Sequence, residues 1–108
     1  MVSNFYGNLT AVLQDFGLLR CFKVVVDSAV AGVRKPDPQI FQMAIELLSL
    51  NPKDVTIIGD SYDKDIQPAV SLGCQAIWYR GDSWDPESDA AHDYQPTINN
   101  LIEVYDLL

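Results

Sequence analysis

The chain has 108 residues, of which 48% are hydrophobic and 20% charged, a size and a balance typical of one small folded domain rather than of a disordered chain. Fifteen acidic residues against seven basic ones give a net charge of −8, which excludes the basic surface of a nucleic-acid-binding protein. No apolar run reaches the roughly 20 residues that span a bilayer, and residues 1–6 do not resemble a secretory signal. We therefore expect a cytoplasmic protein without membrane contacts.

Apolar side chains recur at helical spacing over residues 8–16 and predict a helix that ends at Gly17. The β-branched run over residues 22–26 then predicts a strand. A turn-rich stretch follows over residues 31–38. Near its end, Asp37 is expected to cap a helix that begins at Pro38, where the missing N–H of proline costs nothing. The helical spacing of the apolar residues predicts that one face of this helix is apolar, formed by Ile40, Phe41, Ala44, Ile45, Leu47 and Leu48.

A continuous apolar run over residues 55–58 predicts a second strand. A helix is expected over residues 65–72, with Pro68 tolerated only in its first turn and Gly73 at its end. Residues 76–79 predict a third strand. This alternation of strands and helices is the signature of an α/β fold with a parallel sheet.

The acidic, turn-rich stretch over residues 81–96 predicts an exposed loop. Within it, His92 is the only histidine of the chain and is expected to be solvated rather than catalytic. Thr97 is expected to cap a last helix whose apolar face extends to Leu108. Cys21 and Cys74 form no spaced cluster, and we expect both to be buried, reduced thiols, as is usual in the cytoplasm.

Two carboxylates follow the second predicted strand. Asp60 stands directly after Gly59, which allows a sharp turn, and Asp65 stands five residues later. Carboxylate oxygens in this number suit Mg²⁺, which keeps several waters and also binds phosphate. The alternative is that Asp60 merely caps the following helix. A calcium-binding loop is excluded, because Tyr62 and Lys64 stand where such a loop needs ligands.

The other candidate site residues stand near the expected ends of strands. In parallel α/β sheets, ligands bind at the carboxyl ends of the strands. Lys35 precedes a proline and so has an extended backbone at the start of a helix, where its ammonium can neutralise a phosphate. Ser3 and Asn4 can offer a hydroxyl and backbone N–H groups to an anion. The alternatives are an ordinary surface lysine and a simple helix cap.

Taken together, these segments resemble the haloacid dehalogenase-like hydrolase superfamily, especially its phosphatase-like branch. Residues 2–4 are similar to its second motif, residues 33–41 to its third, and residues 58–65 to its fourth, in the same order and spacing. The resemblance covers nearly the whole chain through Arg80. It implies a three-layer Rossmann-like parallel sheet flanked by helices.

The resemblance also implies roles for the site residues. Ser3 and Asn4 would bind the phosphate, Lys35 would stabilise its charge and that of the nucleophile, Asp60 would ligate Mg²⁺, and Asp65 would ligate it or orient its waters. The implied reaction is attack by an aspartate on a small phosphorylated metabolite, followed by hydrolysis of the acyl phosphate.

One part of the family pattern has no counterpart in these 108 residues. The first motif is a strand that ends in aspartate-x-aspartate, and Asp63 and Asp65 have this spacing but belong to the fourth motif. We therefore expect residues 1–108 to be the C-terminal part of a core domain, without the nucleophile strand or a cap domain. The sheet would lack its central strand, between those ending at Ser3 and Asp60. These two strands would then pair directly, or exchange a strand with another copy in a homo-oligomer, or have lost their neighbour by truncation, which we favour.

Three functions remain open on this basis. The first is a fragment of a Mg²⁺-dependent phosphatase, inactive by itself. The second is a non-enzymatic α/β module for binding or assembly, favoured by the missing aspartate pair. The third is a dehalogenase of the same superfamily, disfavoured by the glycine-aspartate-serine sequence with Asp65.

Overall fold

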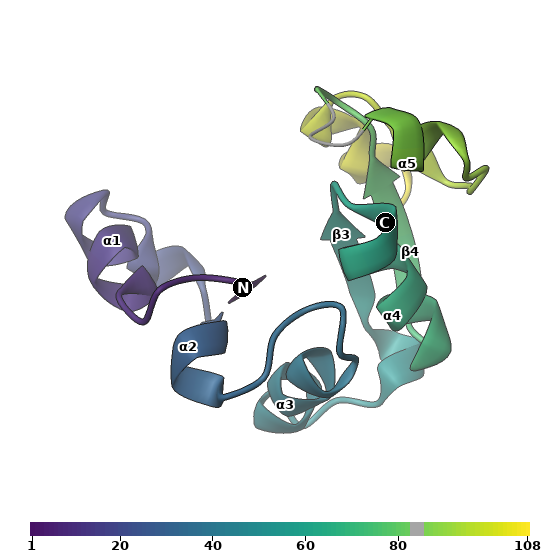
Figure 1. The fold of residues 1–108 in the computed structure, drawn as a ribbon. Coiled ribbons are helices and arrows are strands. Elements are labelled where there is room, and N and C mark those ends of the chain that lie inside the picture. The colour runs from purple at the N-terminus through teal and green to yellow at the C-terminus, as the bar shows by residue number, and fades with distance from the viewer. Residues whose placement is uncertain (83–85) are drawn as a thin grey trace.

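A computed structural model describes residues 1–82 and 86–108 and shows an α/β fold with two small parallel sheets (Figure 1). Strands β1 (Val2–Ser3) and β2 (Val26–Asp27) form the first sheet, and the second has the order β3 (Thr56–Gly59), β4 (Gln75–Tyr79), β5 (Thr97–Ile98). The α-helices are α1 (Leu9–Asp15), α2 (Ser28–Ala31), α3 (Gln39–Leu47), α4 (Gln67–Ser71) and α5 (Pro86–Ala90). Shorter helical turns occur at Leu19–Cys21, Pro52–Asp54, Tyr62–Ile66 and Leu101–Asp106. Among the described residues no helix is both long and apolar enough to cross a membrane.

Helix α3 connects the two sheets. Its residues Ile40, Phe41 and Ala44 are buried with Val26 of β2. Its next residue, Ile45, is buried instead in a cluster formed with the other sheet. Figure 1 shows α3 between the N-terminal half of the chain and the half that carries β3 and β4. The amphipathic helix predicted to begin at Pro38 therefore provides the core that holds both halves together.

Strand β4 is the central strand of the second sheet, and its middle residues Ala76, Ile77 and Trp78 are all at most 3% exposed. A strand buried on both faces needs an uninterrupted apolar run, which is the pattern that predicted it. Trp78 packs there with Ile66 and Ala69, which belong to the helical segment between β3 and β4.

Several predicted boundaries are confirmed. Gly17 follows α1 with a φ of 68°, a left-handed conformation that glycine adopts without strain. The Asp37 carboxylate accepts a hydrogen bond from the N–H of Gln39 (3.0 Å), although α3 begins at Gln39, one residue later than predicted, with Pro38 at its N-cap position. Pro68 lies in the first turn of α4, as required. The helical segment before α4 nevertheless begins at Tyr62, three residues earlier than predicted, because it opens as a π-helical turn.

The strand predicted over residues 22–26 is wrong in position. Only Val26 and Asp27 are in β2, since their partner β1 offers only two residues, Val2 and Ser3. A strand is defined by its pairing, and β-branched residues outside the paired stretch remain irregular.

The predictions for the last 28 residues are also partly wrong. Part of the expected loop forms helix α5, while its residues 83–85 lie outside the described part of the chain. Thr97 does not cap a helix, because Thr97 and Ile98 pair with β4. Asn100 caps a 3₁₀ helix instead, accepting from the N–H of Ile102 (3.1 Å). Pairing with the free edge of β4 therefore outweighs the preference for a helix that the apolar spacing of this segment indicates.

The cysteines are both free, as expected, but only one is buried. Cys74 is 8% exposed, and burial raises the pKa of its thiol. Cys21 is exposed, contrary to prediction, because it ends a short turn, Leu19–Cys21, that contains no buried residue.

Strands β1 and β3 do not pair with each other in the described chain: β1 pairs with β2, and β3 pairs with β4. A cavity of about 360 Å³ lies between them, lined by Met1 and Val2, by α3 and by residues 55–60. The parallel sheet is thus incomplete between these strands, and direct pairing, one of the three expected arrangements, is not formed.

Candidate active site

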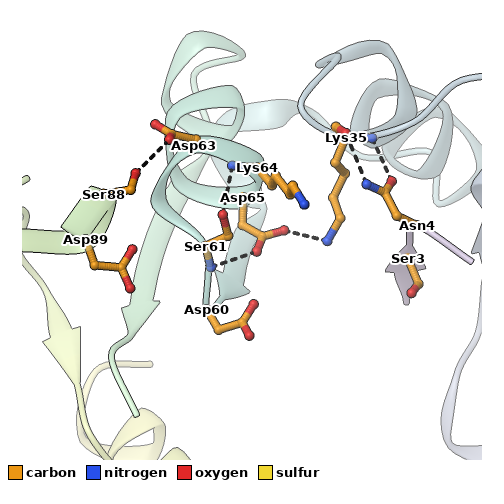
Figure 2. A pocket seen from close by; sticks show the side chains of 10 residues that line it. All are labelled: Ser3, Asn4, Lys35, Asp60, Ser61, Asp63, Lys64, Asp65, Ser88 and Asp89. Atoms are coloured by element: carbon orange, nitrogen blue, oxygen red, sulfur yellow. Dashed lines mark hydrogen bonds and ion pairs between the residues drawn. The ribbon is translucent and has the colours of Figure 1, made fainter. Parts of the chain in front are cut away.

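A cavity of about 600 Å³ lies where strands β1 and β3 end (Figure 2). All five residues predicted from the sequence line it. The complete lining is Ser3, Asn4, Lys35, Asp60, Ser61, Asp63, Lys64, Asp65, Ser88 and Asp89. The predicted convergence at the carboxyl ends of the strands is therefore confirmed, while the roles of these residues remain predictions.

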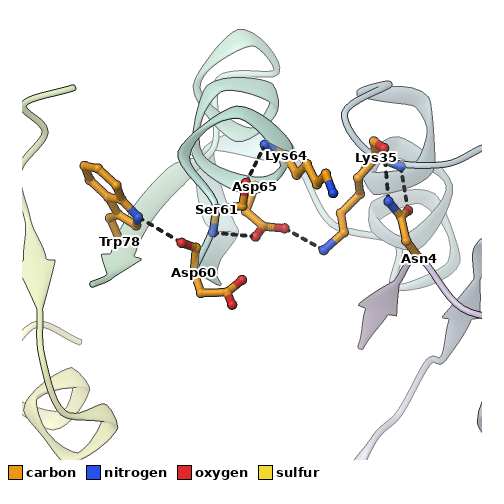
Figure 3. A network of polar contacts seen from close by, with 7 residues as sticks. All are labelled: Asn4, Lys35, Asp60, Ser61, Lys64, Asp65 and Trp78. Atoms are coloured by element: carbon orange, nitrogen blue, oxygen red, sulfur yellow. Dashed lines mark hydrogen bonds and ion pairs between the residues drawn. The ribbon is translucent and has the colours of Figure 1, made fainter. Parts of the chain in front are cut away.

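The end of β1 is clamped to the loop that carries Lys35. The side-chain oxygen of Asn4 accepts a hydrogen bond from the N–H of Lys35 (2.8 Å), and its amide nitrogen donates to the Lys35 carbonyl (3.1 Å) (Figure 3). Ser3, the last residue of β1, is half-buried beside this clamp. The Asn4 side chain is thus oriented toward the Lys35 backbone, and its structural role is to fix that loop.

The Lys35 ammonium forms an ion pair with Asp65 at 2.6 Å, and the two side chains are only 16% and 6% exposed. The second carboxylate oxygen of Asp65 accepts a hydrogen bond from the N–H of Ser61 (3.1 Å). A charge-assisted bond in a partly desolvated position is stronger than one in water. Lys35 therefore has a fixed position at the cavity wall.

Gly59 is needed for the position of the Asp65 side chain, and not for the sharp turn that was predicted. A Cβ atom at position 59 would collide with the Asp65 side chain. Its φ is not in the left-handed region, unlike that of Gly73. The glycine is needed because the strand and the buried carboxylate approach closely.

The Asp60 carboxylate, in contrast, is exposed and has no hydrogen-bond or ionic partner among the residues that the structure describes (Figure 2). Its backbone carbonyl accepts a hydrogen bond from the buried Trp78 indole (3.2 Å). Ser61, rather than Asp60, caps the following helical turn, accepting from the N–H of Lys64 (3.3 Å). The capping alternative for Asp60 is therefore wrong, and its carboxylate is available to a ligand.

The wall opposite β1 was not predicted from the sequence. Asp63 accepts a hydrogen bond from the Ser88 hydroxyl (3.1 Å) and lies 3.4 Å from His92. His92 also stacks on the Tyr62 ring, with 3.8 Å between the ring centroids. Its side chain is 31% exposed, so His92 is only partly solvated, and its ring packs against the site's helical turn. These contacts bring α5 to the cavity.

Five lining residues were not predicted as site residues, for two different reasons. Ser61, Asp63 and Lys64 stand inside the recognised Asp60–Asp65 segment, so their position there was a usable signal. Ser88 and Asp89 belong to a stretch that resembled a loop, and no local pattern indicated that tertiary contacts bring them to the site.

A family model for haloacid dehalogenase-like hydrolases matches residues 1–73, about two thirds of the chain. The chain belongs to the haloacid dehalogenase-like hydrolase family. Its fold agrees, since the mixed helices and parallel strands are those of solved haloacid dehalogenase-like hydrolases.

Relatives within this family have matching segments. Haloacid dehalogenase-like hydrolase domain-containing protein 3 of Bos taurus is 34% identical over all of this chain and 45% of its own length. A phosphoserine phosphatase of Thermus thermophilus is 30% identical over 86% of this chain and 36% of its own. A Bacillus subtilis hydrolase of the family, solved with magnesium bound, has a TM-score of 0.77 and 26% identity over 99% of this chain and 47% of its own. The chain thus spans less than half the length of these relatives.

Proposed function

We propose that this chain forms the phosphate- and magnesium-binding part of the active site of a phosphatase that hydrolyses small phosphate monoesters. The observation that carries the proposal is the convergence of Ser3, Lys35, Asp60 and Asp65, from three separate segments, on one cavity. The similarity to the phosphoserine phosphatase of Thermus thermophilus supports the same reaction class. Residues 1–108 would be the C-terminal part of a core domain. The free state of both cysteines favours a cytoplasmic location.

In this proposal Ser3 and Lys35 hold the phosphate. The net charge of −8 repels an anion at long range, so local groups must attract it. The Ser3 hydroxyl would donate a hydrogen bond to a phosphoryl oxygen, and the Lys35 ammonium would stabilise its developing charge. Asp65 would act as a positioning residue, because its two oxygens bind the Lys35 ammonium and the Ser61 N–H.

The residues present fit a magnesium ion. Asp60 offers an exposed carboxylate at the cavity wall, and Mg²⁺ takes one or two carboxylates, with water and substrate phosphate completing its six ligands. No cluster of three or more acidic, histidine or cysteine residues suited to a metal occurs in the described part of the chain. The ion would therefore bind tightly only with further ligands, and it would supply charge neutralisation at the phosphoryl group.

The nucleophile would come from protein outside these 108 residues. The family reaction needs an aspartate that attacks phosphorus while the alcohol leaves, and water then hydrolyses the acyl phosphate. Asp65 cannot serve, since it is paired with Lys35, and Asp60 would be bound to the metal. Residues 1–108 by themselves are therefore expected to bind phosphate without turning over a phosphate ester.

The proposal is tested by isothermal titration calorimetry, in which Mg²⁺ is titrated into the chain in the presence of inorganic phosphate. Asp60→Asn is expected to weaken Mg²⁺ binding about tenfold or more, because an amide is a poorer ligand for a hard cation. Asp54→Asn is the matched control: it makes the same charge change at an exposed residue before the opposite end of β3. Equal affinity in wild type and Asp60→Asn would contradict the proposal.

A further inference from the structure

Lys64 is a cation of the cavity that the proposed reaction does not use. It lines the same cavity as Lys35 and Asp60, and its side chain extends toward the side of the cavity on which Lys35 lies (Figure 2). The side chain is exposed, and its ammonium has no anionic partner in the portion of the chain that is described. Its backbone N–H is held by the Ser61 hydroxyl, so the start of the side chain is fixed.

The neighbours of Lys64 are directed elsewhere. Asp63 turns to the opposite wall, where it contacts Ser88 and His92. Asp65 turns inward and pairs with Lys35. Successive residues of a helical turn point in different directions, so each of the three serves a different wall. Lys64 is the one that presents its charge to the cavity.

The two lysines of the cavity differ in their ion pairing. The charge of Lys35 is balanced by Asp65 at 2.6 Å, whereas the Lys64 ammonium forms no ion pair with any residue in the described structure. An ammonium of this kind binds an anionic group as a point charge. One exposed positive charge matches a singly charged group such as a carboxylate.

We propose that Lys64 binds a carboxylate on the non-transferred part of the substrate, so that the site prefers phosphate monoesters of small hydroxy acids over uncharged phosphate esters. The inference rests on the proposed phosphatase function and adds the substrate class. Lys35 and Ser3 hold the phosphoryl group, and Lys64 holds the other end of a short molecule within the same cavity of about 600 Å³.

The test compares two ligands of similar size, 2-phosphoglycolate and ethyl phosphate, by calorimetric titration of the chain with Mg²⁺ present. Wild type is expected to bind 2-phosphoglycolate about threefold to fivefold more tightly than ethyl phosphate, because an exposed ion pair contributes up to about 1 kcal/mol. Lys64→Gln should abolish this preference and leave the affinity for ethyl phosphate within about twofold. Lys64→Arg should retain it.

Lys53→Gln is the matched control. It removes the same charge at an exposed lysine in the turn Pro52–Asp54, which precedes the opposite end of β3, and it should keep the preference. Circular dichroism should show unchanged folding, since both lysines are exposed.

Three results would overturn the inference. These are a wild type without preference, an unchanged preference in Lys64→Gln, and an equal loss of affinity for both ligands in that variant, which would place Lys64 at the phosphoryl group. If neither ligand binds wild type, the proposed phosphatase function itself fails, and this inference fails with it.

Discussion

At the scale of single residues, the site depends on close approaches around Asp65. The Asp65 side chain is only 6% exposed. Its carboxylate forms an ion pair with Lys35 and accepts a hydrogen bond from the Ser61 N–H. Removing one partner of a buried ion pair leaves the other charge buried without a counter-charge. The resulting loss of stability is larger than the net stabilisation that the intact pair provides. Asp65 is therefore structural as well as functional, and Gly59 is the residue that makes room for it.

Gly59→Ala is expected to destabilise the protein by about 1–3 kcal/mol, the usual cost of forcing an extra carbon into a packed site. The reason is the collision of the new methyl group with the Asp65 side chain. Urea denaturation of both proteins measures the change in the free energy of unfolding.

The control is a double-mutant cycle with Asp65→Gly, which removes the colliding atoms. Gly59→Ala should cost clearly less in that background, because the two positions are coupled. The same cost in both backgrounds would show that the loss has another cause.

At the scale of elements, the site is assembled by side-chain clamps rather than by long strands. Strand β1 has only two residues, too few to fix the direction of its end by backbone pairing alone. The two hydrogen bonds between Asn4 and the Lys35 backbone join this end to the loop before α3. On the other side, Asp27 of β2 accepts from the N–H groups of Gly7 and Leu9 and so anchors the loop after β1.

Asn4→Ala is expected to lower the free energy of unfolding by about 1–3 kcal/mol, since two hydrogen bonds of roughly 0.5–1.5 kcal/mol each are lost. It should also weaken phosphate binding, because the Lys35 loop is no longer fixed to β1. Thermal or urea unfolding and phosphate titration measure the two effects.

Asn8→Ala provides the comparison, because Asn8 is exposed and makes no capping hydrogen bond with its side chain. It should change stability by a few tenths of a kcal/mol. If both variants behave alike, the Asn4 clamp contributes nothing.

At the scale of the whole molecule, the two sheets are joined through α3, and no backbone hydrogen bonds pair their strands within residues 1–82 and 86–108. The edges of β1 and β3 that face each other are unpaired in the described structure, and the cavity between them is lined largely by apolar residues of α3 and β3. Unpaired edges next to apolar surface favour association with another strand.

The chain is therefore expected to associate in solution, with an apparent mass that rises with protein concentration in analytical ultracentrifugation. A peptide that contains an apolar strand ending in aspartate-x-aspartate should reduce this association by occupying the gap. A scrambled peptide of the same composition is the control. A monomer at all concentrations would contradict the prediction.

The sequence by itself determined the elements that are long or strongly patterned and five of the ten residues that line the cavity. The apolar run of β4 and the amphipathic spacing of α3 are local signals, and both elements form as predicted. Asp60 and Lys35 could be named because carboxyl ends of parallel strands share one edge. Tertiary structure alone decided the short elements: β5 forms because β4 has a free edge, although its residues have helical spacing. Likewise, tertiary contacts bring α5 to the cavity, namely the hydrogen bond from Ser88 to Asp63 and the packing of His92 on Tyr62, since contacts between distant segments leave no periodic pattern in the sequence.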